Sequence, residues 1–319
     1  LPQTFDVLKT RCEPLGIVLE FFDNNNFEID NNVFGILIQL PGKNGRIWDP
    51  TSIIDQVHKC DAIVTIAIDP LAQVLIKPMG ELGADIVVGS AQRFGVPIAC
   101  GGPHAAFFAT KEIYKRQIPG RIVGQSVDVE GNQALRLALQ TREQHIRRDK
   151  ATSNICTAQV LLAVLSSFYA VHHGPNGLKK IAKKILKYRS DFEYIISNLE
   201  YPLDKYSGFD SIDVYCPEAS KIIQLASEAG YNLRVLPIGS DIDNASGFGV
   251  TFDELSCDQE IYKLHQILAE VKGKNVYDIS KFINENDPLK NIPHREKPWL
   301  EQSVFNQYQS ETDLMRYIH

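Results

Sequence analysis

Short apolar runs alternate with amphipathic segments along the first 110 residues of the chain. Helical spacing of apolar residues predicts helices at residues 7–11 and 52–59. Runs rich in β-branched residues predict buried strands at residues 17–22, 34–40, 62–68 and 85–88. Such strands, separated by helices, are typical of a parallel sheet covered on both faces, so we predict an α/β fold.

Helical patterns dominate the middle of the chain. No Gly or Pro occurs from Asn132 to His173, and apolar residues recur at helical spacing from Leu178 to Leu199, so we predict long helices here. Five shorter elements then follow. We predict strands at residues 212–215, 233–236 and 249–252, and helices at residues 219–229 and 259–271. This set of elements predicts a compact α+β domain.

These patterns divide the chain into four parts. We predict a truncated parallel-sheet domain at residues 1–150, connecting helices at 151–200, a small α+β domain at 201–274 and a connector at 275–319. The last part is polar and contains three prolines, which favours an extended arm. Because the chain opens without a methionine and closes within a helix-like pattern, we expect a piece of a longer protein.

The composition is that of an ordinary globular protein, with 44% hydrophobic and 23% charged residues among 319. A net charge of −6 without a basic stripe argues against a nucleic-acid-binding protein. The longest apolar run, around residues 160–164, falls far short of the roughly 20 residues needed to cross a bilayer, so we expect no membrane span. The six cysteines are scattered in neither a zinc pattern nor a disulfide framework, and we expect a reducing compartment.

Polar residues follow two predicted strands, at the edge where open parallel sheets bind ligands. Asp69 after the first of them either pairs with a protonated ring nitrogen of a cofactor or caps the following turn. Ser90 and Gln92 follow the other strand, and Gln92 is neither nucleophilic nor able to form an imine. The next glycines, Gly101 and Gly102, favour a tight turn.

The densest polar cluster lies at residues 141–157. Cations beside a helix N-terminus favour a site for phosphate or carboxylate, and a solvated charged face is the alternative. The candidates are Arg142, His145, Arg147, Arg148, Lys150, Ser153 and Asn154. Cys156 is either a reactive thiol beside these cations or a buried small residue.

Long contiguous runs of the chain resemble one known family. The runs are residues 83–97, 101–109, 119–124, 137–159 and 305–312, the first reading Gly-Ala-Asp-Ile-Val-Val-Gly-Ser-Ala-Gln-Arg-Phe-Gly-Val-Pro. They resemble the P-protein family of the glycine cleavage system, and the resemblance extends along the whole chain. It implies the fold of type I pyridoxal-phosphate (PLP) enzymes, with the sheet domain as the large PLP-type domain. The family builds this fold twice, as two halves that pack like a dimer.

The resemblance places the PLP lysine in a C-terminal half outside this chain, with Gln92 at the corresponding position here. It places Asp69 where the acidic partner of the PLP ring lies. Ser90 and the cluster of residues 147–154 become weak candidates for cofactor binding. Arg142 and His145 become catalytic candidates near the interface between the halves, Cys156 becomes a redox candidate, and no metal is implied. The chain alone is therefore expected to be inactive.

The family implies a PLP-dependent oxidoreductase that releases carbon dioxide from glycine and passes the aminomethyl group to a lipoyl carrier protein. Expected partners are the C-terminal half, the lipoyl carrier (H) protein, glycine and, at full length, a second copy. Neither nucleic acid nor membrane is an expected partner. The expected location is the cytoplasm in a bacterium or the mitochondrial matrix in a eukaryote.

Two alternatives stay open. In one, the chain is a non-catalytic docking half that completes the fold and binds the lipoyl protein. In the other, a different PLP enzyme of the same fold uses a lysine such as Lys77. Lys77 is expected in a loop rather than directly after a strand, which argues against that role.

Overall fold

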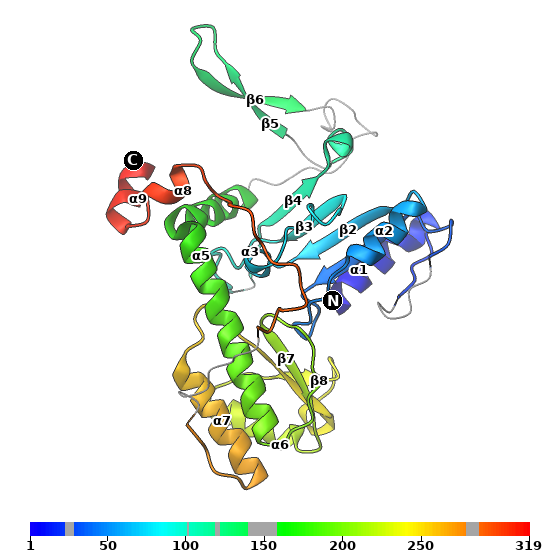
Figure 1. Ribbon diagram of the computed structural model, residues 1–319, viewed down its shortest axis with the longest axis vertical. Coiled ribbons are helices and arrows are strands. Elements are labelled where there is room, and N and C mark those ends of the chain that lie inside the picture. The colour runs from blue at the N-terminus through cyan, green and yellow to red at the C-terminus, as the bar shows by residue number, and fades with distance from the viewer. Residues whose placement is uncertain (23–28, 101, 119–121, 140–157, 279–286) are drawn as a thin grey trace.

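The first layer of the structure is a four-stranded sheet with the order β1-β2-β3-β4. The computed structural model describes residues 1–22, 29–100, 102–118, 122–139, 158–278 and 287–319 (Figure 1). Strands β1 (Gly35–Leu40), β2 (Ile63–Ile68) and β3 (Ile86–Ser90) are parallel, as predicted. Strand β4 (Ala106–Thr110) lies antiparallel to β3 and was not predicted.

Alternating burial fixes this sheet in the core. Every second residue of β2 is buried, ending in Ile66 and Ile68. Helix α2 (Thr51–Lys59) buries Ile53, Ile54 and Val57 in the same apolar cluster. This part of the chain also contains helix α1 (Pro2–Cys12), the short helix α3 (Ala72–Leu75) and the 3-10 turns Glu13–Leu15 and Glu112–Tyr114.

The predicted strand at residues 17–22 is wrong. These residues pair with no strand of the described chain, and Phe21 is 78% exposed. The ring of Phe21 contacts that of Phe5 in α1, with centroids 4.1 Å apart. A run of β-branched residues forms a strand only where a sheet edge is available, and this run packs beside a helix instead.

The predicted helix at residues 132–173 is wrong over its first part. Strands β5 (Ile122–Val127) and β6 (Gln133–Leu139) form an antiparallel hairpin that stands away from the rest of the molecule (Figure 1). Asp128 closes its turn by accepting hydrogen bonds from the backbone N–H groups of Glu130 and Asn132, at 2.8 and 2.9 Å. The pairing of β6 with β5 therefore overrides the helical pattern.

The later part of that prediction is confirmed by helix α5 (Ala158–Asn198), which buries Leu178 and Ile185. The helix is bent at Gly174, whose φ of 57° and ψ of −177° are not helical. A Cβ at Gly174 would lie 2.5 Å from the carbonyl oxygen of Phe305, in helix α8 (Val304–Gln307). The bend therefore depends on the absence of a side chain.

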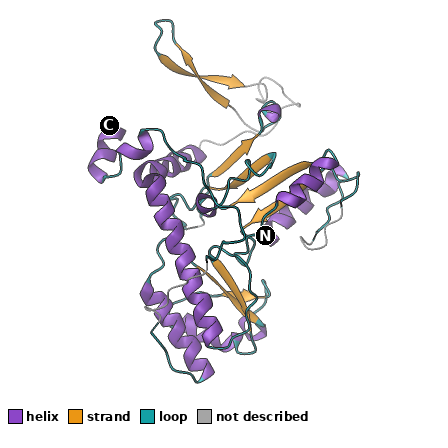
Figure 2. Ribbon diagram, in the orientation of Figure 1, coloured by secondary structure: helices purple, strands orange, loops and turns teal. Residues whose placement is uncertain are grey.

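The small α+β unit has all five predicted elements. Its antiparallel sheet has the order β7-β9-β8 and contacts α5 and α6 (Ala219–Glu228), as Figure 2 shows. The strands are β7 (Ser211–Tyr215), β8 (Arg234–Leu236) and β9 (Gly247–Thr251), and the helices are α6 (Ala219–Glu228), α7 (Asp258–Lys272) and the 3-10 turn Ile242–Asn244. Domain limits at residues 150, 200 and 274 stay a prediction.

The predicted connector crosses back over the molecule. Residues 287–303, here called the strap, run without regular structure to α8 and to the final helix α9 (Glu311–Ile318). The strap is attached to the end of α3, since the backbone N–H of Lys77 donates to the carbonyl of Pro293 at 2.7 Å. Within the described ranges no helix is long and apolar enough to cross a membrane.

Candidate functional site

Asp69 lies at the carboxyl end of β2, on the sheet edge where ligands of this fold class bind. Its backbone N–H donates to the carbonyl of Leu40, 3.0 Å away, at the end of β1. Its Oδ1 accepts hydrogen bonds from the N–H groups of Leu71 and Ala72, at 2.8 and 3.0 Å. Asp69 therefore caps the turn that leads into α3, which was one of the two interpretations of this residue.

The second oxygen of Asp69 is taken by Arg93. Nε of Arg93 lies 2.8 Å from Oδ2 of Asp69, and Nη2 of Arg93 donates to Oδ2 of Asp210. Arg93 comes from the turn after β3, while Asp210 directly precedes β7. The guanidinium carbon also lies 5.9 Å from the ring centre of Phe209. This Asp69–Arg93–Asp210 network joins the large sheet to the small one.

Burial governs the electrostatics of this network. Burial raises the pKa of Asp69, Arg93 opposes the rise, and the neighbouring carboxylate of Asp210 adds to it. Burial lowers the pKa of Arg93, but the carboxylates of Asp69, Asp210 and Asp253 outweigh burial and raise it. Nη1 of Arg93 is buried and finds no hydrogen-bond partner among the described residues. One cation thus serves two carboxylates in a poorly hydrated position.

Three further polar groups gather at the end of β3. Ser90 Oγ accepts a hydrogen bond from the backbone N–H of Gln92 at 3.2 Å and lies 3.4 Å from Nδ1 of His104. The side-chain nitrogen of Gln92 lies close to Gly102, 3.5 Å from where a Cβ would stand. Ser90 and Gln92 are therefore neighbours, as their positions in the sequence suggested. No contact joins either side chain to Asp69 within the described residues.

The turn that carries Arg93 is held from behind by α5. Phe94 stacks on Tyr169 with ring centroids 5.6 Å apart, and the hydroxyl of Tyr169 donates to Glu254 of the small unit. A Cβ at Gly95 would lie 2.7 Å from the Tyr169 ring. Burial raises the pKa of Tyr169, as does its bond to the Glu254 carboxylate, so this hydroxyl stays a donor. The turn is thus fixed against both sheets.

The described residues do not fit PLP at this place. A PLP site of this fold needs a lysine after β3 and a carboxylate free to pair with the ring nitrogen. Both oxygens of Asp69 are engaged, and its cationic partner is Arg93. The turn of residues 91–95 contains no lysine. The sheet edge therefore has the position of a cofactor site and the contacts of a structural one.

The polar cluster predicted at residues 141–157 lies outside the described residues. The roles suggested for Arg142, His145, Arg147, Arg148, Lys150, Ser153, Asn154 and Cys156 therefore stay predictions. What the sequence did not reveal is Asp210, which is 117 residues from its partner Arg93. The only signal was Arg93 itself, a charged residue beside Gln92 at the end of a buried strand.

Comparisons with known proteins agree on one family. The sequence model described as "Glycine cleavage system P-protein" matches residues 1–268. Glycine dehydrogenase (decarboxylating) of Prochlorococcus marinus (strain NATL1A) is 85% identical over all 319 residues, which cover 33% of that relative. The protein of the same name from Nostoc sp. (strain PCC 7120) is 46% identical, with 32% of its length covered. The chain thus spans about a third of the length of these relatives.

Solved structures show the same fold. A crystal structure of glycine decarboxylase (P-protein) of the glycine cleavage system, in inhibitor-bound form, is 31% identical with a TM-score of 0.69. The match covers 76% of this chain and 56% of that one. The apo cysteine desulfurase from Thermococcus onnurineus NA1, 15% identical with a TM-score of 0.54 over 83% of this chain and 69% of that one, shares only the fold.

The two structures confirm the predicted α/β fold of type I PLP enzymes. The family match covers well over half of the chain, and it includes the network around Arg93 and all three sheets of the described residues. This chain belongs to the glycine cleavage system P-protein family.

Proposed function

We propose that this chain is part of a PLP-dependent glycine decarboxylase of the glycine cleavage system. In this proposal the longer protein releases carbon dioxide from glycine and passes the aminomethyl group to the lipoyl arm of a carrier protein. The observation that carries it is the 85% identity, over the whole chain, to a glycine dehydrogenase (decarboxylating). Relatives about three times longer leave room for a second half of the same fold.

The proposal assigns this chain the half without the cofactor lysine. Support comes from Asp69, because the carboxylate that would face a cofactor ring is bonded to Arg93. Gln92 offers no amine for an imine in the turn after β3. The chain by itself is then inactive and completes the active site of the other half. Lys77 is a poor substitute, since its backbone is bonded to the strap rather than placed after β3.

The remaining partners belong to the same proposal. They are the C-terminal half, the lipoyl carrier protein, glycine and a second copy of the full-length protein, all in the cytoplasm of a bacterium. A docking role is the competing function, and Arg142 and His145 separate the two. Alanine at either position lowers kcat if the cluster takes part in the chemistry, whereas a rise in KM alone indicates docking.

Borohydride reduction tests the assignment of halves. The longer protein is loaded with substoichiometric PLP, reduced, digested and analysed by mass spectrometry for pyridoxyl-lysine. We expect one modified lysine, outside these 319 residues, and loss of glycine-dependent release of carbon dioxide in parallel. Modification of Lys77, or of any other lysine of this chain in step with activity, contradicts the proposal. The 319-residue chain alone, treated identically, is expected to show no stoichiometric modification.

A further inference from the structure

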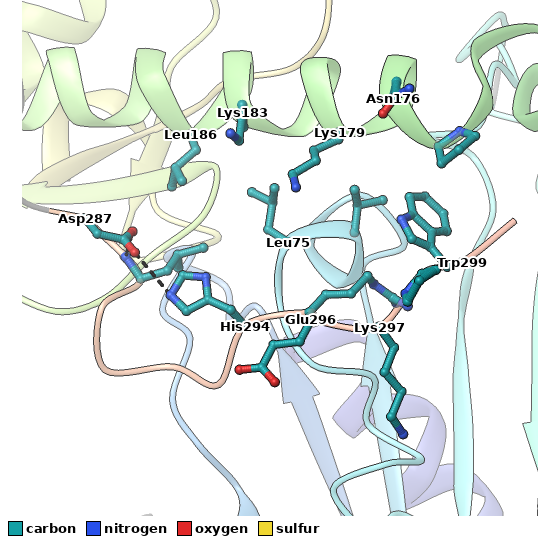
Figure 3. Close-up of a pocket in the computed structure, with 15 residues that line it drawn as sticks. Leu75, Asn176, Lys179, Lys183, Leu186, Asp287, His294, Glu296, Lys297 and Trp299 are labelled. Atoms are coloured by element: carbon teal, nitrogen blue, oxygen red, sulfur yellow. Dashed lines mark hydrogen bonds and ion pairs between the residues drawn. The ribbon is translucent and has the colours of Figure 1, made fainter. Parts of the chain in front are cut away.

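A pocket of about 640 Å³ lies between α5 and the strap (Figure 3), and none of the three residues of the Asp69–Arg93–Asp210 network lines it. Its walls are the outer face of α5 after the Gly174 bend and strap residues 287–299, and Val74 and Leu75 of α3 form its floor. This volume is typical of small-molecule sites and far too small for a folded partner.

Hydrogen bonds to α3 hold the strap in place at the pocket. The N–H of Arg295 donates to the carbonyl of Leu75 at 3.0 Å, and its guanidinium donates twice to the carbonyl of Gln73, at 3.0 and 2.8 Å. The guanidinium carbon lies 5.1 Å from the ring centre of Trp299. The strap is thereby held at a defined distance from α5, which keeps the pocket open.

The lysines on the α5 wall lack anionic partners. Lys179 and Lys183 are exposed, line the pocket and form no ion pair with any described residue. Lys179 extends from the helix toward Leu75 (Figure 3). Two neighbours on the same helix differ, since Lys184 donates to the carbonyl of Glu254 and Lys187 pairs with Asp191. The helix thus leaves unpaired the two lysines that face the pocket.

The acidic residues of the pocket do not offset these cations. Asp287 pairs with His294 at 3.1 Å across the rim. Glu296 points away from α5 (Figure 3). Lys297 points away from α5 as well and pairs with Glu81 outside the pocket, at 3.0 Å. Among the described residues, the guanidinium of Arg295 contacts a carbonyl oxygen and an aromatic ring and forms no ion pair. The chain carries a net charge of −6, yet the pocket lining has more cations than carboxylates. Its cations are Lys179, Lys183, Arg295 and Lys297, and its carboxylates are Asp287 and Glu296.

We propose that this pocket binds a small polyanion carrying phosphate or carboxylate groups, held by Lys179 and Lys183 against the Arg295–Trp299 wall. Residues four apart on a helix have Cβ atoms about 5–6 Å apart, a spacing that two linked anionic groups can bridge. Lysine binds phosphate as a point charge, so no forked geometry is needed. Like charges at this spacing repel each other, and a bound anion removes the repulsion. This proposal is independent of the function proposed for the longer protein.

Chemical modification of lysines in the intact protein tests the site directly. The rate of acetylation at each lysine is measured by peptide mass spectrometry with and without inorganic pyrophosphate, at ionic strength matched with NaCl. At ten times Kd we expect modification of Lys179 and Lys183 to slow about tenfold. Lys180, exposed on the same helix and outside the pocket, is the internal control and is expected to react at an unchanged rate. Equal protection of Lys180, or no protection, overturns the proposal.

Two arms sharpen the result. Citrate replaces pyrophosphate in the first, and protection by citrate as well as pyrophosphate identifies a general polyanion site, whereas protection by pyrophosphate alone identifies a phosphate site. In the second, calorimetry compares the double variant Lys179→Gln/Lys183→Gln with Lys180→Gln. We expect the double variant to lose pyrophosphate affinity by about tenfold or more and the control to keep it. Unchanged affinity of the double variant overturns the proposal, whatever the labelling shows.

Discussion

The two charged regions of the molecule use their cations in opposite ways. In the Asp69–Arg93–Asp210 network one guanidinium lies between two carboxylates, and the three side chains are between 10% and 23% exposed. In the strap pocket Lys179, Lys183 and Arg295 have no carboxylate partner among the described residues. The network lies at the sheet edge where a cofactor is expected, whereas no sequence motif indicated a binding site at the pocket.

The difference separates charges that hold a structure from charges that bind a ligand. The charge of a paired, buried cation is already compensated by its partners, and removing the cation leaves those partners uncompensated. An exposed, unpaired cation contributes little to folding and remains available. Position on a sheet edge indicates a site only when the side chains there are free, and at Asp69 they are bonded.

The largest effect is expected from Arg93→Ala. It leaves the carboxylates of Asp69 and Asp210 buried without a counterion, which destabilises the chain by about 3 kcal/mol. Urea denaturation measures the free energy of unfolding. The matched variant Arg136→Ala, in the exposed hairpin strand β6, is expected to stay within about 0.5 kcal/mol. A loss below about 1 kcal/mol for Arg93→Ala would show that the network does not hold the two sheets together.

A smaller loss is expected from Gly174→Ala, which acts on the other region. The left-handed φ of 57° and the approach of the Phe305 carbonyl to 2.5 Å both disfavour a Cβ, so we expect about 2 kcal/mol of destabilisation. Gly230→Ala is the control, with φ of +88° and no atom within 4 Å of the added carbon. It carries backbone strain alone, about 1 kcal/mol. Equal losses in both variants would show that the contact between α5 and α8 does not fix the bend.

The pH dependence of stability distinguishes the regions further. Because burial raises the pKa of Asp69 in the folded chain above the ordinary value of 3.8, ionising this group costs the folded state more than the unfolded one. Its contribution to stability therefore falls as the pH rises through 3.8 and levels off above the folded pKa. Asp69→Asn removes that fall. Relative to the parent, the variant gains stability as the pH rises through 3.8, and a constant difference contradicts the raised pKa.

The sequence predicted correctly those helices and strands whose formation is determined by residues close together in the chain. Ile66 and Ile68 alternate within a short β-branched run, and Leu178 and Ile185 recur at helical spacing, so each pattern specifies its own element. Strand β6 was missed because a run without Gly or Pro favoured a helix. The alternation of its leucines at positions 135, 137 and 139 was the signal available.

The contacts of the site could not be predicted, because they join residues distant in sequence. Asp69 could be placed at a strand end, but nothing near it in sequence indicates that Arg93 and Asp210 meet there. Lys179 and Lys183 read as an ordinary solvated helix face. Only the strap, returning more than a hundred residues later, turns that face into a pocket wall.

The smallest change in stability is expected from Lys179→Glu, and this variant tests the comparison of the two regions most directly. This change places a carboxylate on the α5 wall of the pocket, with Glu four residues before Lys183, the favoured orientation for a helical ion pair. We expect a gain of about 0.5 kcal/mol in stability together with loss of pyrophosphate binding. Lys179→Gln removes the repulsion but cannot form an ion pair, so it gains less stability while also weakening pyrophosphate binding.

If Lys179→Glu still binds pyrophosphate, the availability of these cations is not what makes the pocket a site. If binding disappears while stability rises, the same two positions have been converted from a binding surface into a structural pair, which is the state in which Arg93 already lies.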